Sequence, residues 1–143
     1  MATLAGLSTR LGRLLDDPSG VIYDAATLEE ALRTALGRYN QALGAQATLQ
    51  GLDGEAETSL PQGDEEILLY GAASFAVGGR CLKRAESFNL DQNVPATLRE
   101  RGQEMARAFE GYLERRRVAK LHQEGVSPLP EQGWGLDAWE EQA

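Results

Sequence analysis

The sequence predicts an all-α protein with a bundle-like body of four helices and an extended C-terminal tail. Apolar residues recur at three- and four-residue steps in four stretches, which is the spacing of one helix face. Pro and Gly stand between these stretches, where they end helices. We therefore divide the 143 residues into a helical domain, residues 1–124, and a docking tail, residues 125–143.

The first two helices are expected over residues 3–15 and from about Asp24 to Leu43. The turn at residues 16–20, with Pro18 and Gly20, ends the first. Asp24 is a suitable N-cap for the second, and Thr27 with Glu30 forms an alternative capping box. Their expected buried faces are Leu4, Leu7, Leu11, Leu14 and Leu15, then Leu28, Ala31, Leu32, Ala35, Leu36, Tyr39 and Leu43.

Residues 44–63 lose the helical period and contain the turn-forming pair Asp53-Gly54. They predict either a long loop or a small β-hairpin between the second and third helices. A non-helical segment of this length within a compact domain is usually functional or ordered by a partner. We therefore expect residues 45–62 to make contacts between chains.

The third helix is expected from about Asp64 to Ser87, and its middle is rich in Gly, Ala and Ser. Because Gly is costly in a helix, this composition predicts a central position where a neighbouring backbone comes close. A break at Gly78-Gly79 is the alternative. Four larger residues are expected to fill gaps in the core: Ile67, Tyr70, Phe75 and Leu82.

The fourth helix is expected from about Pro95, a residue suited to a first turn, to His122. Glu and Arg pairs at helical spacing predict an exposed charged face, and Gly125 is expected to end the helix. One apolar side is expected to be formed by Leu98, Met105, Phe109, Tyr112 and Leu113.

Composition narrows the classes of function. The formal net charge is −8, which argues against general nucleic-acid binding, because phosphate contacts come mainly from Lys and Arg. The single cysteine, Cys81, excludes an internal disulfide. We find no apolar run long enough to cross a bilayer and expect no membrane partner.

The sequence shows no set of residues that would carry catalysis, so we expect no enzyme, metal site or cofactor. His122, the only histidine, is expected on the surface, and Cys81 is expected to be a buried, inert thiol. The acids at 16–17 and at 64–66 are expected to lie at helix ends or on a solvated face. The glycine-rich stretch of the third helix lacks the pattern of a phosphate-binding loop.

The tail, residues 125–143, has the composition of a docking segment. Two prolines and three glycines oppose a helix, and the tail has four acids and no Lys or Arg. Tryptophan is a preferred interface anchor because it carries a large apolar area on few rotatable bonds. The expected anchors are Leu129, Trp134, Leu136 and Trp139. The alternatives are docking on another chain, docking on the protein's own body, or a frayed terminus.

A basic cluster formed by Arg115, Arg116, Arg117 and Lys120 lies near the end of the fourth helix. Consecutive helical residues point in different directions, so only one or two of these arginines share a face with Lys120. The cluster is compatible with a salt-bridged helix face, with contact to an acidic partner, or with contact to nucleic acid.

Three stretches in order resemble the head–tail connector, or adaptor, proteins of tailed bacteriophages. The first runs from the acidic helix end at Leu14-Leu15-Asp16-Asp17, through Gly20 and Tyr23–Leu28, to Ala31-Leu32, Ala35-Leu36 and Tyr39. The second is Leu60-Pro61 followed by the alanine-rich helix Glu65–Arg84, which contains Arg80. The third is the long charged helix that follows, so the resemblance covers about residues 10–118.

The resemblance implies a virion structural protein that forms a ring, typically of twelve copies, under the portal protein. Such a ring extends the DNA channel and seats the tail or stopper proteins, while DNA passes without sequence-specific binding. Terminal segments in that family commonly reach onto the portal or a neighbouring subunit. The alternatives are another phage neck or tail-completion protein, and a cytosolic helical adaptor or assembly chaperone that is absent from finished virions.

Overall fold

The computed structural model describes residues 2–86 and 96–123, and side chains for all of these except 83–86 and 96. The described part is all-α and has four helices: α1 (Leu4–Leu14), α2 (Ala25–Leu43), α3 (Glu65–Glu86) and α4 (Ala96–Gln123). A single 3-10 turn, η1 (Gln62–Asp64), leads into α3. The predicted fold class and the number of helices are therefore confirmed.

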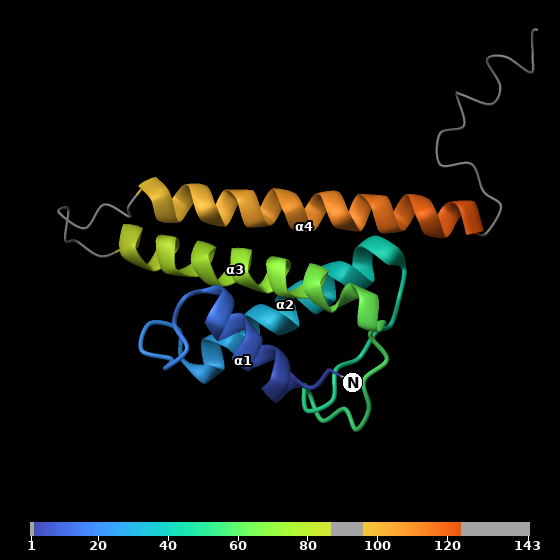
Figure 1. Cartoon of the computed structure of the whole chain (residues 1–143), viewed down its shortest axis with the longest axis horizontal. Helices are drawn as coiled ribbons and strands as arrows, with labels where there is room; N and C mark the ends of the chain where they lie inside the picture. The colour runs from blue at the N-terminus through green and yellow to red at the C-terminus, as the bar shows by residue number, and fades with distance from the viewer. Residues whose placement is uncertain (1, 87–95, 124–143) are drawn as a thin grey trace, which may run out of the picture.

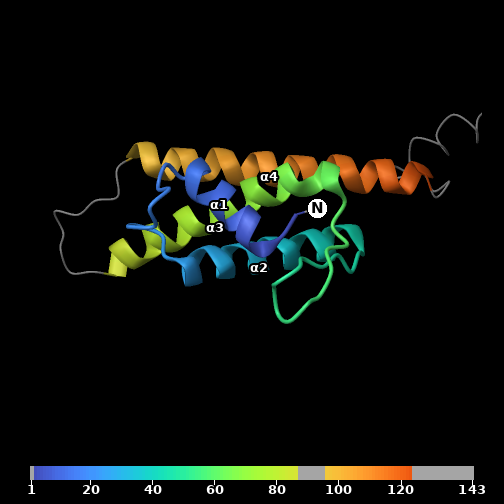
Figure 2. The ribbon, with the colours of Figure 1, turned by 60° about the horizontal axis from the view of Figure 1, so that its bottom comes forward.

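Helix α3 occupies the centre of the arrangement. It lies alongside α4 on one side and packs against α1 and α2 on the other, and α2 also contacts α4 (Figures 1 and 2). The predicted central position of this helix is confirmed, and α3 is continuous through Gly78 and Gly79 rather than broken there. The largest fully buried side chains come from α1, α2, α3, α4 and the loop before η1: Leu7, Leu11, Leu32, Leu49, Asp64, Leu68, Phe109 and Leu113.

The reason for the close packing at α3 differs from the expected one. A Cβ added at Gly71 would lie 2.7 Å from the ring of Phe109, so this glycine admits a side chain of α4 and not a neighbouring backbone. Gly78 and Gly79 are exposed, and a Cβ there would meet nothing within 4 Å. One of the three glycines therefore serves the packing of α3 on α4.

The predicted core faces are correct in part. Met105, Phe109 and Leu113 are buried as expected, whereas Tyr112 is partly exposed at the edge of α4. On α3, Ile67 is buried, but Phe75 is 38% exposed and Leu82 is 63% exposed, so their expected role in the core is wrong. The buried stripe of α3 passes instead through smaller residues at helical spacing, namely Leu68, Leu69, Ala72, Ala73, Ala76 and Val77.

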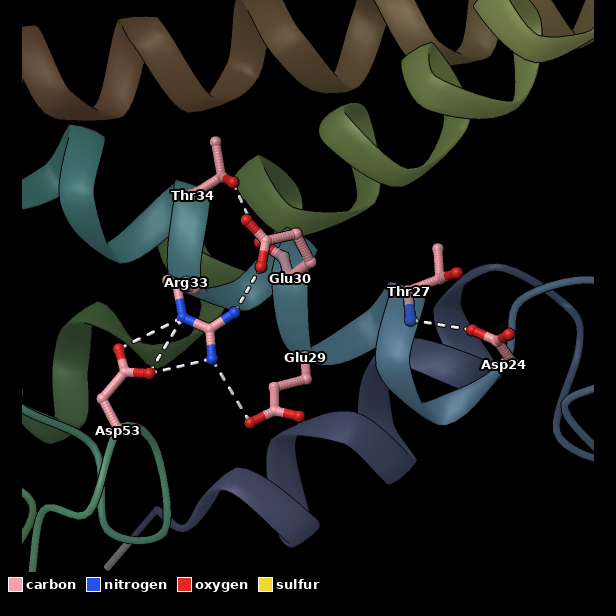
Figure 3. Close-up of polar contacts among 7 residues, drawn as sticks. All are labelled: Asp24, Thr27, Glu29, Glu30, Arg33, Thr34 and Asp53. Carbon is pink, nitrogen blue, oxygen red and sulfur yellow. Dashed lines mark hydrogen bonds and ion pairs between the residues drawn. The ribbon is translucent and has the colours of Figure 1, made fainter.

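The helix ends follow local capping rules. Thr3 caps α1, accepting a hydrogen bond from the Gly6 N–H through its hydroxyl oxygen at 3.0 Å. The Asp24 carboxylate caps α2, accepting from the Thr27 N–H at 2.8 Å (Figure 3). The Asp24 cap is therefore the one adopted, and Thr27 lies inside the helix. Gly44 ends α2 in the left-handed conformation, with φ of 59°.

Candidate functional site

The four predicted tail anchors, Leu129, Trp134, Leu136 and Trp139, lie outside the described residues. The expectation that they contact another chain therefore stays a prediction. The connector around residues 88–93 also lies outside the described part.

Two members of the predicted basic cluster tie α4 to the rest of the body. The Arg116 Nη2 lies 2.6 Å from the Asp64 Oδ1, which forms an ion pair across the start of α3. The Lys120 Nζ donates a hydrogen bond to the Leu43 carbonyl oxygen, at 2.6 Å, near the end of α2. These contacts give Arg116 and Lys120 a role within the chain.

The other two members of the cluster contact residues of α4 itself. Arg117 forms an ion pair with Glu114 one turn earlier, at 2.6 Å, which agrees with a salt-bridged helix face. The guanidinium of Arg115 lies 4.7 Å from the ring centre of Tyr112, a cation–π contact at the surface. The predicted contact of this cluster with a partner stays a prediction.

Asp64 is the polar centre of the core at one end of the bundle. Its side chain is buried, and it accepts a hydrogen bond from the Tyr39 hydroxyl of α2 while pairing with Arg116 of α4. Burial raises the pKa of the Tyr39 hydroxyl, as does its bond to Asp64, so the tyrosine stays protonated and donates. The expectation that Asp64 lies on a solvated face is therefore wrong, because this carboxylate joins three helices.

The excursion at residues 45–62 is ordered by the chain's own residues. Arg33 of α2 binds Asp53 through its Nε and Nη2, at 2.8–3.1 Å, and also pairs with Glu29 and Glu30 (Figure 3). These bonds to Asp53 raise the pKa of Arg33. Leu49 is fully buried, so the loop also contributes to the core.

The excursion is a loop and not a hairpin. Within the described residues it has no strand, and a single parallel bridge joins Thr3 to Gln50. Thr48 and Ser59 bond across the loop, and the Thr58 hydroxyl donates to the Ala2 carbonyl, which holds the start of the chain against it. Between the two alternatives, the sequence pattern was compatible with both, and these long-range contacts select the loop.

The turn before α2 presents two apolar side chains to solvent. The Asp17 carboxylate accepts backbone N–H groups of Val21, Ile22 and Tyr23, at 2.8–3.1 Å, so the turn is held in one shape. These bonds, the Tyr23 N–H above all, lower the pKa of Asp17. Val21 is 82% exposed and Ile22 is 52% exposed. Sequence reasoning treated Val21-Ile22-Tyr23 only as a short apolar connection, although Asp17 before a Pro-Ser-Gly turn is a usable signal.

A groove of about 480 Å³ lies beside this turn, between the start of α2 and the second half of α3. Ile22, Ala26 and Phe75 contribute apolar lining, and the Arg80 guanidinium lies 5.9 Å from the ring centre of Tyr23. The exposed Phe75, which was expected in the core, therefore has a place in the wall of this groove. An apolar groove beside a held apolar turn is suited to binding a protein surface.

The described residues contain no group of acidic, histidine and cysteine side chains that could hold a metal ion. Cys81 is half-buried rather than buried, and His122 is exposed as predicted. Across residues 2–86 and 96–123, none of the helices is long and apolar enough to cross a membrane.

Comparison with models of protein families, with curated proteins and with solved structures found no match to this chain. The family resemblance therefore rests on the residues and the order of elements described above.

Proposed function

We propose that this protein is a head–tail connector, or adaptor, of a tailed bacteriophage. Copies of the chain form a ring that joins the portal to the tail or stopper proteins and continues the DNA channel. The proposal is supported by the resemblance of residues 10–118 to that family. An all-α body with a central third helix and a long charged fourth helix agrees with it.

The observation that carries the proposal is the held apolar turn at Val21-Ile22. A carboxylate with three backbone hydrogen bonds keeps two large apolar side chains in solvent. Exposing such side chains is unfavourable, and fixing them in one shape lowers the entropy that binding would cost. Together with the adjoining groove, this turn has the properties of a contact surface in an assembly.

The test is the place and copy number of the protein in assembled particles. Labelled protein should lie in the neck between head and tail, in a ring, when particles are imaged by cryo-electron microscopy. Protein found elsewhere in the particle, or only in unassembled lysate, would refute the adaptor function. The first result would favour a different neck or tail protein, and the second an assembly chaperone.

A surface variant links this function to the turn. The double substitution Val21→Ser and Ile22→Ser should leave the helical fold intact but reduce incorporation into particles at least several-fold. Gln103→Ser with Arg107→Ser, at exposed positions of α4, serves as the control and should assemble normally. Equal incorporation of both variants would remove the turn from the contact surface.

A further inference from the structure

A surface valley between α1 and α4 combines arginines with tyrosines. Helix α1 packs on α2 and α3, but within the described residues it makes no packing contact with α4, so α3 forms the floor between them (Figure 1). A hollow of about 340 Å³ lies there. It is lined by Arg10, Arg13, Leu14, Glu66, Leu69 and Tyr70. We call this region the α1–α4 valley.

Helix α4 completes the valley with one stripe of residues at three- and four-residue spacing. The ring of Tyr112 stacks on the ring of Tyr70, with centres 6.2 Å apart, and Arg115 lies over Tyr112. One turn pair earlier on the same stripe, Arg101 donates a hydrogen bond to the Leu14 carbonyl oxygen at 3.1 Å, which brings its guanidinium to the end of α1.

The valley carries a surplus of positive charge on an acidic protein. Arg10 is paired with Glu65 and Glu66, at 3.2 and 3.3 Å. Arg13, by contrast, is exposed and has no ion pair within the part of the chain that the structure describes, and the contact of Arg115 is an aromatic ring. The valley therefore offers cationic groups and aromatic faces together, a combination that fits an acidic peptide with aromatic side chains.

The chain's own tail has that chemistry. Residues 125–143 contain both tryptophans of the protein and four acidic residues, without Lys or Arg. Leu129 and Leu136 add apolar groups that suit Leu14 and Leu69 on the valley's surface. We propose that the α1–α4 valley of one copy binds residues 125–143 of a second copy of this chain.

Chain length and stiffness favour a second copy over the same one. Eleven residues of α4 separate Tyr112 from Gln123, so the helix carries the start of the tail about 17 Å past the valley's tyrosine pair. Pro128 and Pro130 favour an extended backbone, which opposes a return along the same helix. The eleven residues from Gln123 to Trp134 span up to about 35 Å when extended, which is enough to reach a neighbour.

Such a contact is head-to-tail, because the tail of each copy occupies the valley of the next. Head-to-tail contacts generate a ring when the rotation between copies closes. The inference rests on the proposed function for its ring, and it names the surface and the segment that would join neighbouring copies.

The test uses two complementary full-length variants. The valley variant, Arg13→Glu with Arg115→Glu, keeps its tail, and the tail variant, Trp134→Ala with Trp139→Ala, keeps its valley. Each alone should associate at least about tenfold more weakly than the wild type, because like charges or lost anchors oppose the contact. Mixed together, they should form a complex of two chains, since one intact tail meets one intact valley.

Tryptophan fluorescence reads out the contact directly. The tail variant contains no tryptophan, so all emission from the mixture comes from the tail of the valley variant. Addition of the tail variant should shift this emission to shorter wavelength, while native mass spectrometry detects the two-chain complex. Absence of either signal would overturn the proposal, and so would a wild-type protein whose tryptophans are shielded at every dilution while it remains a monomer.

A charge-matched control separates the valley from a general electrostatic effect. Arg99 and Arg107 are exposed and lie off the valley stripe, so Arg99→Glu with Arg107→Glu should associate as the wild type does. Equal weakening of this control would overturn the proposal. If the mixed variants form their complex but the wild type is absent from the phage neck, the adaptor function fails while the tail–valley contact stands.

Discussion

Replacing Gly71 with Ala should destabilise the protein, although Ala is the better helix former. The added Cβ would lie 2.7–2.8 Å from three atoms of the Phe109 ring, closer than real Cβ contacts allow. Phe109 is 1% exposed and is packed between α3 and α4, so its ring has little room to move. The substitution therefore forces α3 and α4 apart or displaces the ring.

The expected size of the effect comes from two opposed terms. Overpacking a core costs about 1–3 kcal/mol, and the better helix propensity of Ala returns up to about 1 kcal/mol. The net loss is therefore about 1–2 kcal/mol, or a melting temperature lowered by roughly 3–10 °C for a chain of this size. Gly78 lies on the same helix in open space, so Gly78→Ala should instead raise stability by about 0.5–1 kcal/mol.

Thermal and urea unfolding followed by circular dichroism measure both variants. A double-mutant cycle isolates the cause, because Phe109→Leu removes the ring that meets the new Cβ. In that background, Gly71→Ala should cost little or become stabilising. If Gly71→Ala is as stable as Gly78→Ala, or costs as much without the ring as with it, the close approach of α3 and α4 at this position is wrong.

Two further predictions concern buried polar groups. Asp17→Asn should destabilise the turn before α2, and the difference from the wild type should shrink as the pH falls below about 4. The bonds from Tyr23 and its neighbours lower the folded-state pKa of Asp17, so its contribution is present above the unfolded-state pKa and is lost on protonation; a gap in urea stability that is constant with pH would contradict this. Tyr39→Phe should cost about 1.5–3 kcal/mol by removing a donor from the buried Asp64 carboxylate. Tyr70→Phe, at a half-buried position, serves as the control and should change stability by less than about 0.5 kcal/mol, so equal losses would remove the special role of the Tyr39 hydroxyl.

The sequence predicted the helices well because their signals are local. Leucines at helical spacing, the Asp24 cap and the Gly44 end are each set by residues within one or two turns, and the structure places all three as expected. The same reasoning failed for Phe75 and Leu82, because an apolar side chain alone does not reveal whether a partner helix covers it. Their exposure is one reason that the groove beside Val21-Ile22 was not anticipated.

The candidate contact surfaces depend on residues that the chain brings together from a distance. The tail was identified from its composition, but the arginines of α1 and the tyrosines of α3 and α4 gave no joint signal. The basic cluster on α4 was visible, yet its division between a core ion pair and a surface cation–π contact depends on where α3 begins.

The sequence alone determined the all-α class, the positions of four helices and the separation of an acidic, tryptophan-bearing tail, because periodicity, capping and composition act over short stretches of chain. Only the tertiary structure decided that Asp64 is buried with Tyr39, 25 residues away, and that Gly71 admits the ring of Phe109. It also decided that residues 45–62 fold as a loop on their own body. These outcomes depend on the distance between elements far apart in sequence, and burial and close contact have their energetic effect only once that distance is set.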